Sequence, residues 1–478
     1  MLFNSLSFAI FLPIVFSLYW LIPGEKRRFQ NVLLLISSYV FYGWWDYRFL
    51  FLLIFSTFLD YYSSLKIDSA KNKNVKKTWL FISVFINVGF LGFFKYYNFF
   101  EDNFITVLNS LGFKADIWTI KLILPVGISF YTFHGLSYVF DVYNQMTKPR
   151  KDFIDYALFV SFFPLLVAGP IERATHLLPQ VEQKRTFKYI VAVDGLKQML
   201  WGLFKKMVVA DNCARLVNII FSGASHYSGS TLVVGIVLFA FQIYGDFSGY
   251  SDIAIGTARL FGFELLRNFA YPYFSRDIAE FWRRWHISLT SWFKDYLYIP
   301  LGGSKGNTFV KIRNTFIVFL VSGFWHGANW TFICWGALNA VYFLPLLLMS
   351  KNRNNMEIVA KGRMFPAFKD VIKILITFSL SCFAWIFFRS ATITQAISYI
   401  KTIFSPSILH KPEIYPGTAF TLIGVLILID WIGRERLYPI QMMGVKWPRI
   451  IRWTFYAGIV FSILYFGGHR EPFIYFNF

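Results

Sequence analysis

The sequence predicts an all-α protein that crosses a membrane many times, and three observations support this prediction. Of the 478 residues, 56% are hydrophobic and 21% aromatic, whereas 15% are charged, below the roughly 25% of soluble domains. The mean hydropathy is +0.49. Apolar stretches recur at lengths near the ~20 residues that a helix needs to cross a bilayer. The length fits one integral membrane domain, 1–478, with roughly ten or more spans.

The net charge of +21, from 47 basic and 26 acidic residues, fits this class without a nucleic-acid partner. Cytoplasmic loops of membrane proteins concentrate Lys and Arg, and the sequence has neither an RNA-binding nor a helix-turn-helix signature. The three cysteines, Cys213, Cys334 and Cys382, are far apart in apolar surroundings. Their spacing is typical of neither a metal site nor a disulfide framework, so we expect no bound metal.

The basic clusters predict the topology. Residues 1–23 are apolar from the start, and the basic stretch "EKRRFQ" (25–30) comes after them. This order predicts a retained first span with an outside N-terminus rather than a cleaved signal peptide. Two crossings separate 25–30 from the basic loop 66–77, and two more separate the loops 350–369 and 433–452. We therefore expect these loops inside and both termini outside. The last two crossings are predicted at about 370–389 and 417–432.

Three regions of the chain differ in character. We expect the N-terminal region 1–100 and the C-terminal region 370–478 to form peripheral helices, whereas 120–349 interrupts its apolar runs with Pro, Gly and ionisable residues. Irregular or polar backbone is tolerated at membrane depth only where it is buried in protein or lines a wet cavity. We therefore expect 120–349 to form the functional core.

Within this core, the stretch "PYFSRDIAEFWRRWHISLTSWFKDYLYIPLGG" (272–303) is too polar for a lipid-facing span. Its large apolar residues recur at three- or four-residue steps, which predicts one amphipathic helix from Pro272 to Pro300. Glu280 and Arg284 lie one turn apart and could pair. Such a helix often lies on the membrane surface. Because His286 is flanked by tryptophans near the edge of the apolar stripe, an inward-folded, partly buried element is the preferred interpretation.

A second histidine, His326, stands in "SGFWHGANW" (322–330) between two apolar runs. It could be a structural residue bonded between helices. However, an ionisable side chain inside a span is costly to desolvate and is by default a functional candidate. Ser322, His326 and Asn329, at i, i+4 and i+7, would share one helix face. Trp325 is a further candidate for the lining of a cavity there.

A neutral imidazole is a natural general base. His326 could take the proton from a hydroxyl group that attacks an activated acyl group, such as a thioester, without a metal. A second polar group, His286 or Asn329, would steady the substrate or the developing oxyanion. Two alternatives remain open: metal ligation by the two histidines, and a covalent route in which Cys334, two turns after His326, carries the acyl group.

Taken together, these stretches resemble the membrane-bound O-acyltransferase family. The resemblance rests on "FWRRWHISLTSWFKDYLYIPLGG" (281–303) and "SGFWHGANWTFICWGALNA" (322–340). With "QIYGDFSGYSDIAIG" (242–256) and the ending "PFIYFNF" (472–478), it is most similar to the bacterial alginate O-acetylation branch. The resemblance covers nearly the whole chain. It implies roughly 11–13 membrane helices, with re-entrant or amphipathic elements, around a central tunnel.

The resemblance also implies roles for individual residues. His326 matches the family's catalytic histidine, and His286 matches the second catalytic position. Asp246, Ser248 and Asp252 could line the tunnel; alternatively, small residues there pack helices and the carboxylates pair with Arg259. The donor would be cytoplasmic acetyl-CoA or a related thioester, used as a substrate with no permanently bound cofactor. Three basic residues of the stretch 272–303 could attract its phosphates: Arg283, Arg284 and Lys294.

On the outer side, the resemblance implies a polysaccharide acceptor, often reached through a separate SGNH-hydrolase-like acetyltransferase, and a place in the bacterial inner membrane. Three other functions compete with the cross-membrane O-acetyltransferase. A D-alanyl transferase would share the histidine chemistry but take its acyl group from a carrier protein. A transporter or flippase would also need polar groups in broken helices, although the two halves of this sequence show no pairing. A non-catalytic scaffold would need no histidine at 326.

Overall fold

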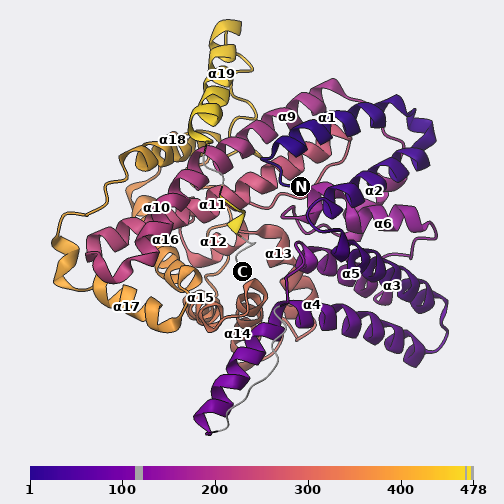
Figure 1. Ribbon diagram of the computed structural model, residues 1–478, viewed down its shortest axis with the longest axis horizontal. Helices are drawn as coiled ribbons and strands as arrows, with labels where there is room; N and C mark the ends of the chain where they lie inside the picture. The colour runs from indigo at the N-terminus through magenta and orange to yellow at the C-terminus, as the bar shows by residue number, and fades with distance from the viewer. Residues whose placement is uncertain (113–121, 469–470, 475–478) are drawn as a thin grey trace. The chain divides into compact units, whose positions relative to one another are not determined.

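A computed structural model describes residues 1–112, 122–468 and 471–474, and the regular elements in these residues are helices (Figure 1). The predicted all-α class is confirmed. The described chain divides into two compact units. The first unit holds residues 1–188 with 261–265, and the second unit holds the rest. The predicted three-region division stays a prediction, and the last four residues of the stretch 472–478 lie outside the described residues.

Six helices of the described chain are long and apolar enough to cross a membrane. A seventh candidate is the pair Leu6–Leu21 and Gly24–Gly43, which bends by 108° at its break. The sequence predicted more spans because it counted apolar runs that fold into shorter or bent helices, such as Gly417–Gly433. The six spanning candidates are Tyr47–Ser69, Lys73–Ser110, Gly229–Leu260, Trp330–Leu348, Phe368–Arg389 and Arg449–Phe466.

The first unit is built from eight α-helices in its described residues: α1 (Leu6–Leu21), α2 (Arg27–Gly43), α3 (Leu50–Ser69), α4 (Lys73–Ser110), α5 (Ile128–Tyr143), α6 (Phe153–Ser161), α7 (Phe163–Leu166) and α8 (Ala174–Glu182). Buried polar groups join these helices. Asp60 of α3 accepts hydrogen bonds from Ser83 and Asn87 of α4, at 2.6 and 2.7 Å. His134 of α5 accepts the backbone N–H of Glu172 through Nε2. The polar residues that interrupt the apolar runs here therefore pin helices to each other.

The second unit contains eleven α-helices in its described residues: α9 (Tyr189–Leu203), α10 (Asp211–Ser222), α11 (Gly229–Leu260), α12 (Ile278–Arg284), α13 (Ile287–Phe293), α14 (Thr308–His326), α15 (Trp330–Leu348), α16 (Phe368–Arg389), α17 (Ile393–Ile403), α18 (Gly417–Gly433) and α19 (Arg449–Phe466). Two π-helical turns interrupt this series, Phe204–Ala210 after α9 and Lys294–Tyr298 after α13. Helices α16 and α18 confirm helices at the two crossings predicted near 370–389 and 417–432.

Glycines set the closest helix contacts of the second unit. Gly202 of α9 faces Gly249 of α11, where an added Cβ would lie 2.6 Å from the Gly249 carbonyl oxygen. Gly323 of α14 and Gly336 of α15 play the same part, because a Cβ on either would clash with the backbone of the other helix. Small residues thus let two long helices approach to backbone contact. The α14–α15 hairpin carries His326 at its turn.

Candidate active site

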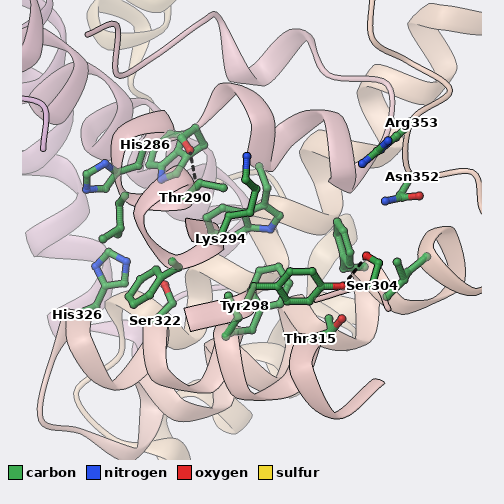
Figure 2. Close-up of a pocket in the computed structure, with 18 residues that line it drawn as sticks. His286, Thr290, Lys294, Tyr298, Ser304, Thr315, Ser322, His326, Asn352 and Arg353 are labelled. Atoms are coloured by element: carbon green, nitrogen blue, oxygen red, sulfur yellow. Dashed lines mark hydrogen bonds between the residues drawn. The ribbon is translucent and has the colours of Figure 1, made fainter. Parts of the chain in front are cut away.

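A cavity of about 250 Å³, called the large cavity below, lies within the second unit. It is bounded by α12, α13, the turn Lys294–Tyr298, the facing sides of α14 and α15, and the start of the loop after α15. Figure 2 shows His286 and His326 near one end, Asn352 and Arg353 at the opposite end, and Lys294 and Tyr298 between them. The walls are mainly aromatic and aliphatic. The polar or ionisable residues of the lining are His286, Thr290, Lys294, Tyr298, Ser304, Thr315, Ser322, His326, Asn352 and Arg353.

The helix predicted over 272–303 is broken at His286. Helix α12 ends at Arg284, and His286 takes φ 43° and ψ 55°, in the left-handed region that non-glycine residues seldom adopt. Two backbone hydrogen bonds of 2.9 Å clamp the turn, from Ala270 N to Arg284 O and from Ile287 N to Asn268 O. Periodicity could not reveal this break, because both short helices continue the same apolar stripe. The break turns the imidazole into the large cavity.

The orientation of the His286 ring is set by Asn268, which is fully buried. Nδ1 of His286 lies 3.0 Å from Oδ1 of Asn268, and the same oxygen accepts from the backbone N–H and the hydroxyl of Ser288. Nε2 of His286 is buried without a hydrogen-bond partner in the described chain. Burial lowers the pKa of His286 to about 3, so the imidazole is neutral at physiological pH.

His326 is the last residue of α14 and is 4% exposed. Its ring is surrounded by aromatic side chains. The ring centroids of Trp325, Trp335 and Phe388 lie 4.9, 5.1 and 5.3 Å from its own. Trp325 also contacts the ring of His286, at 6.2 Å, although it does not line the large cavity. The aromatic rings shield both histidines from bulk water, which strengthens any electrostatic interaction formed there.

One prediction about the segment after His326 is wrong, because the helix ends there. Gly327 is extended, and Asn329 caps the next helix, with Oδ1 accepting from the backbone N–H of Thr331. Asn329 therefore does not share a helix face with Ser322 and His326, and only the latter two line the large cavity. Cys334, which the alternative covalent route would use, belongs to α15 and lies outside that lining.

The three basic residues expected at the donor site have different surroundings. Lys294 lines the large cavity. Arg284 is buried and pairs with Glu280 at 2.7 Å, as expected from their one-turn spacing. Arg283 donates to the backbone oxygens of Asn352 and Asn355, at 2.6 and 2.8 Å. Neither arginine lines the large cavity, because each guanidinium is bound by acceptors of the protein itself.

The acidic residues of α11 lie in a separate polar region. Asp246 forms an ion pair of 2.7 Å with Lys206, and Asp252 forms one of 2.6 Å with Lys205. The alternative pairing with Arg259 is wrong, since Arg259 binds Asp194. These residues do not line the large cavity.

Ser248 and Asp252 instead line a second, small cavity with room for about one water molecule. Asn268 lines the same small cavity. The sequence analysis did not single out Lys205 and Lys206, which pair with the carboxylates of α11. Their signal was available, because two adjacent ionisable residues in the apolar run "LFKKMVVA" (203–210) require buried partners.

Other residues of the site carry no signal in sequence. Asn268 is distant from both histidine motifs and belongs to an irregular segment. Thr290 and Tyr298 follow His286 by short steps, but only the broken helix brings them to the large cavity. Arg353 comes from the basic loop after α15, which the sequence explains by topology alone. In the described residues, no group of three or more His, Cys, Asp or Glu side chains is placed to bind a metal ion.

Comparisons with known proteins identify the family of this chain. The model of the membrane-bound O-acyltransferase family matches residues 128–388. A probable alginate O-acetylase, AlgI, of Pseudomonas aeruginosa is 37% identical over 455 residues, which cover 93% of this chain and 84% of that protein. A peptidoglycan O-acetyltransferase of Helicobacter pylori is 33% identical over 100% of this chain and 98% of that protein.

A more distant relative is a teichoic acid D-alanyltransferase of Bacillus subtilis, 26% identical over 280 residues, or 56% of this chain and 69% of that protein. The resemblance found in the histidine motifs is confirmed by the family model, which matches more than half of the chain, and by relatives above 30% identity along most of its length. The chain therefore belongs to the membrane-bound O-acyltransferase family and is a multi-pass membrane O-acyltransferase.

Proposed function

We propose that this protein takes an acetyl group from cytoplasmic acetyl-CoA, or a related thioester, and delivers it for the O-acetylation of an extracytoplasmic polysaccharide. One observation carries the proposal. A mainly apolar cavity has two buried histidines near one end, the basic side chain of Lys294 in its middle, and that of Arg353 at the other end (Figure 2). The names of the relatives from Pseudomonas aeruginosa and Helicobacter pylori support an acetyl group and a glycan acceptor.

The proposed chemistry needs one general base. His326 removes the proton from an acceptor hydroxyl while the hydroxyl oxygen attacks the carbonyl carbon of the thioester. The tetrahedral intermediate collapses with cleavage of the carbon–sulfur bond, and the imidazolium of His326 returns the proton to the leaving thiolate. The products are an ester and a free thiol. Ser322, one turn before His326 on the lining of the large cavity, would donate its hydroxyl hydrogen to the oxyanion.

In this proposal the donor binds at the basic end of the large cavity. The phosphates of coenzyme A would bind near Lys294 and Arg353, so that the uncharged arm of the thioester enters between the aromatic walls. The loop that contains Arg353 is one of the basic loops for which the sequence predicts a cytoplasmic position. Acceptor hydroxyls would then approach the histidines from the outer side, either on the polysaccharide or on a partner protein of the SGNH-hydrolase-like type.

The decisive experiment replaces His326. Full-length protein in vesicles is supplied with radiolabelled acetyl-CoA and a polysaccharide acceptor, and acetyl transfer is measured. His326→Gln should reduce the rate by about 10²–10⁴-fold, the range of general base catalysis. His410→Gln is the matched control, because His410 is exposed in a loop away from the large cavity. A His326→Gln protein with wild-type transfer would refute the proposal.

A second function has one observation in its favour, the similarity to the teichoic acid D-alanyltransferase of Bacillus subtilis. It would use the same histidines but a D-alanyl thioester on a carrier protein. The same vesicles, supplied with acetyl-CoA or with a D-alanyl-loaded carrier, separate the two possibilities. Transfer from the D-alanyl-loaded carrier but not from acetyl-CoA would refute the acetyl proposal and support the D-alanyl one.

A further inference from the structure

We infer that Asn268 is a positioning residue that fixes the tautomer of His286, so that Nε2 of His286 faces the large cavity as a hydrogen-bond acceptor. The inference rests on the proposed function, because it assigns His286 a defined part in binding the substrate. None of the stretches on which the family resemblance rests includes Asn268, which belongs to the irregular segment between α11 and α12.

The orientation of the Asn268 amide follows from its neighbours. The backbone N–H of Ser288 can only donate, and it lies 3.3 Å from Oδ1 of Asn268. That atom must therefore be the oxygen of the amide. The nitrogen on the other side donates to the hydroxyl of Ser251 at 3.1 Å. Both ends of the amide are engaged, so the side chain cannot flip without losing hydrogen bonds.

The tautomer of His286 follows in turn. A carbonyl oxygen accepts hydrogen bonds and cannot donate them, so Nδ1 of His286, 3.0 Å away, must carry the proton. In the neutral ring Nε2 then has the lone pair. Nε2 is buried and has no hydrogen-bond partner in the described chain, and His286 lines the large cavity. A substrate N–H or O–H group would complete the arrangement.

This tautomer decides between the two roles considered for His286, steadying the substrate or stabilising the oxyanion. An oxyanion needs a hydrogen-bond donor, and a lone pair at Nε2 cannot supply one. His286 therefore steadies the substrate by accepting a hydrogen from it. The proton of the attacking hydroxyl goes to His326, and a second N–H or O–H of the bound substrates donates to His286. Asn268 touches neither substrate and acts only through the imidazole.

Several groups face His286 and bear on its titration. Aromatic rings from three segments pack against the imidazole: Phe247, Phe269 and Trp325. The ionisable residues that share the large cavity with it are Lys294, Tyr298, His326 and Arg353. Those of the small cavity, behind Asn268, are Lys205, Tyr244, Asp252, Arg267, Tyr271, Asp430 and Tyr438. A charge placed at position 268 would act directly on the imidazole, because the side chain of Asn268 contacts Nδ1 of His286 at 3.0 Å.

Two substitutions test the inference. Asn268→Leu keeps the approximate volume but removes the acceptor for Nδ1, and it should lower acetyl transfer by about 10- to 100-fold, the usual cost of losing a ring-orienting partner. Asn268→Asp keeps an acceptor but adds a charge that stabilises the imidazolium. Its activity should fall as the pH falls, because protonated Nε2 no longer accepts, and recover as the pH rises. Ser251→Ala, which removes only the outer hydrogen bond, is the control and should keep the wild-type pH profile.

A spectroscopic measurement reads the tautomer without relying on activity. The full-length chain contains seven histidines, so ¹⁵N-histidine labelling in detergent gives few signals, and those of His286 are the ones absent from His286→Gln. We expect a protonated Nδ1 and an unprotonated Nε2 in the wild type, and a different or mixed state in Asn268→Leu.

The outcomes distinguish this inference from the proposed function. A protonated Nε2 in the wild type, or identical ¹⁵N signals in Asn268→Leu and the wild type, would overturn the inference and leave the role of His326 intact. An Asn268→Asp variant with the wild-type pH profile would also overturn it. Full transfer by His326→Gln would instead refute the proposed function, while the ¹⁵N signals would still report the tautomer.

Discussion

The ammonium group of Lys206 lies 2.7 Å from the carboxylate of Asp246 and 2.8 Å from that of Asp211, with all three side chains 2–3% exposed. Asp246 also accepts the backbone N–H of Ile474 at 2.7 Å, and Lys206 donates to the backbone oxygen of Glu471. Asp246, for which the sequence left open a tunnel-lining or an ion-pairing role, thus anchors α11, the π-helical turn after α9 and the segment 471–474 to one another.

This buried network predicts a large stability effect. Lys206→Met leaves two buried carboxylates without their cation and should lower the free energy of unfolding by about 3–5 kcal/mol. The measurement is thermal or denaturant unfolding in detergent. Lys305→Met, at an exposed position of the same unit, is the control and should change little. Equal stability of the two variants would show that the network contributes nothing.

The contact between α14 and α15 predicts that Gly323 is needed for catalysis as well as stability. A Cβ at Gly323 would clash with the backbone oxygen of Phe332, so Gly323→Ala must push the two helices apart and displace His326. We expect a loss of about 1–3 kcal/mol in stability, typical of overpacking, and reduced acetyl transfer. Gly424→Ala has open space around it and should be neutral or stabilising by up to about 1 kcal/mol. Unaltered transfer in Gly323→Ala would contradict the prediction.

Arg283 predicts a kinetic effect at the donor end of the large cavity. Its two hydrogen bonds hold the backbone on either side of Arg353, the loop residue proposed to meet the donor phosphates. Arg283→Gln should therefore raise KM for acetyl-CoA several-fold at nearly constant kcat. The same change should not affect S-acetyl-pantetheine, which has no phosphate. Lys369→Gln, at an exposed position in the first turn of α16, is the matched control. An equal rise in KM for both donors would argue against a phosphate site.

The buried neutral state of His286 predicts how stability varies with pH. Burial lowers the pKa of His286 to about 3, whereas in the unfolded chain it is near 6.5. Between these values the unfolded state binds the proton and the folded state does not, so stability falls as the pH falls from about 6.5 toward 3.

His286→Gln should remove up to about 1.4 kcal/mol per pH unit from this slope. Unfolding temperatures of both proteins in detergent between pH 7 and 5 provide the measurement. His226→Gln, exposed in a turn, should retain the wild-type slope. A parallel pH dependence of His286→Gln and the wild type would show that His286 is not held neutral.

The local sequence was sufficient for the class of the protein and for several residues that line the large cavity. Hydropathy and length predicted membrane helices, because each span must satisfy its own backbone in lipid and therefore leaves a long apolar run. His326 and His286 stood out because ionisable side chains in apolar surroundings are costly. The structure brings both histidines to one cavity with Ser322 and Lys294, four of the residues that the sequence singled out.

The spacing of apolar residues could not predict where helices break. The apolar stripe of 272–303 continues through the left-handed turn at His286, and the spacing of Ser322, His326 and Asn329 looks helical although α14 ends at His326. Such breaks are stabilised by distant partners, such as Asn268 and Ala270 for the His286 turn. A pattern within one segment contains no information about a hydrogen bond to another.

The sequence by itself determined that this is an all-α membrane protein with two histidines in apolar surroundings. The reason is that the free energy of transferring a side chain from water to lipid depends mainly on that residue's own type. Only the tertiary structure decided which buried ions pair, which arginines hold loops, and which side chain contacts Nδ1 of His286. Those outcomes depend on the directions of hydrogen bonds between segments that are far apart in the chain.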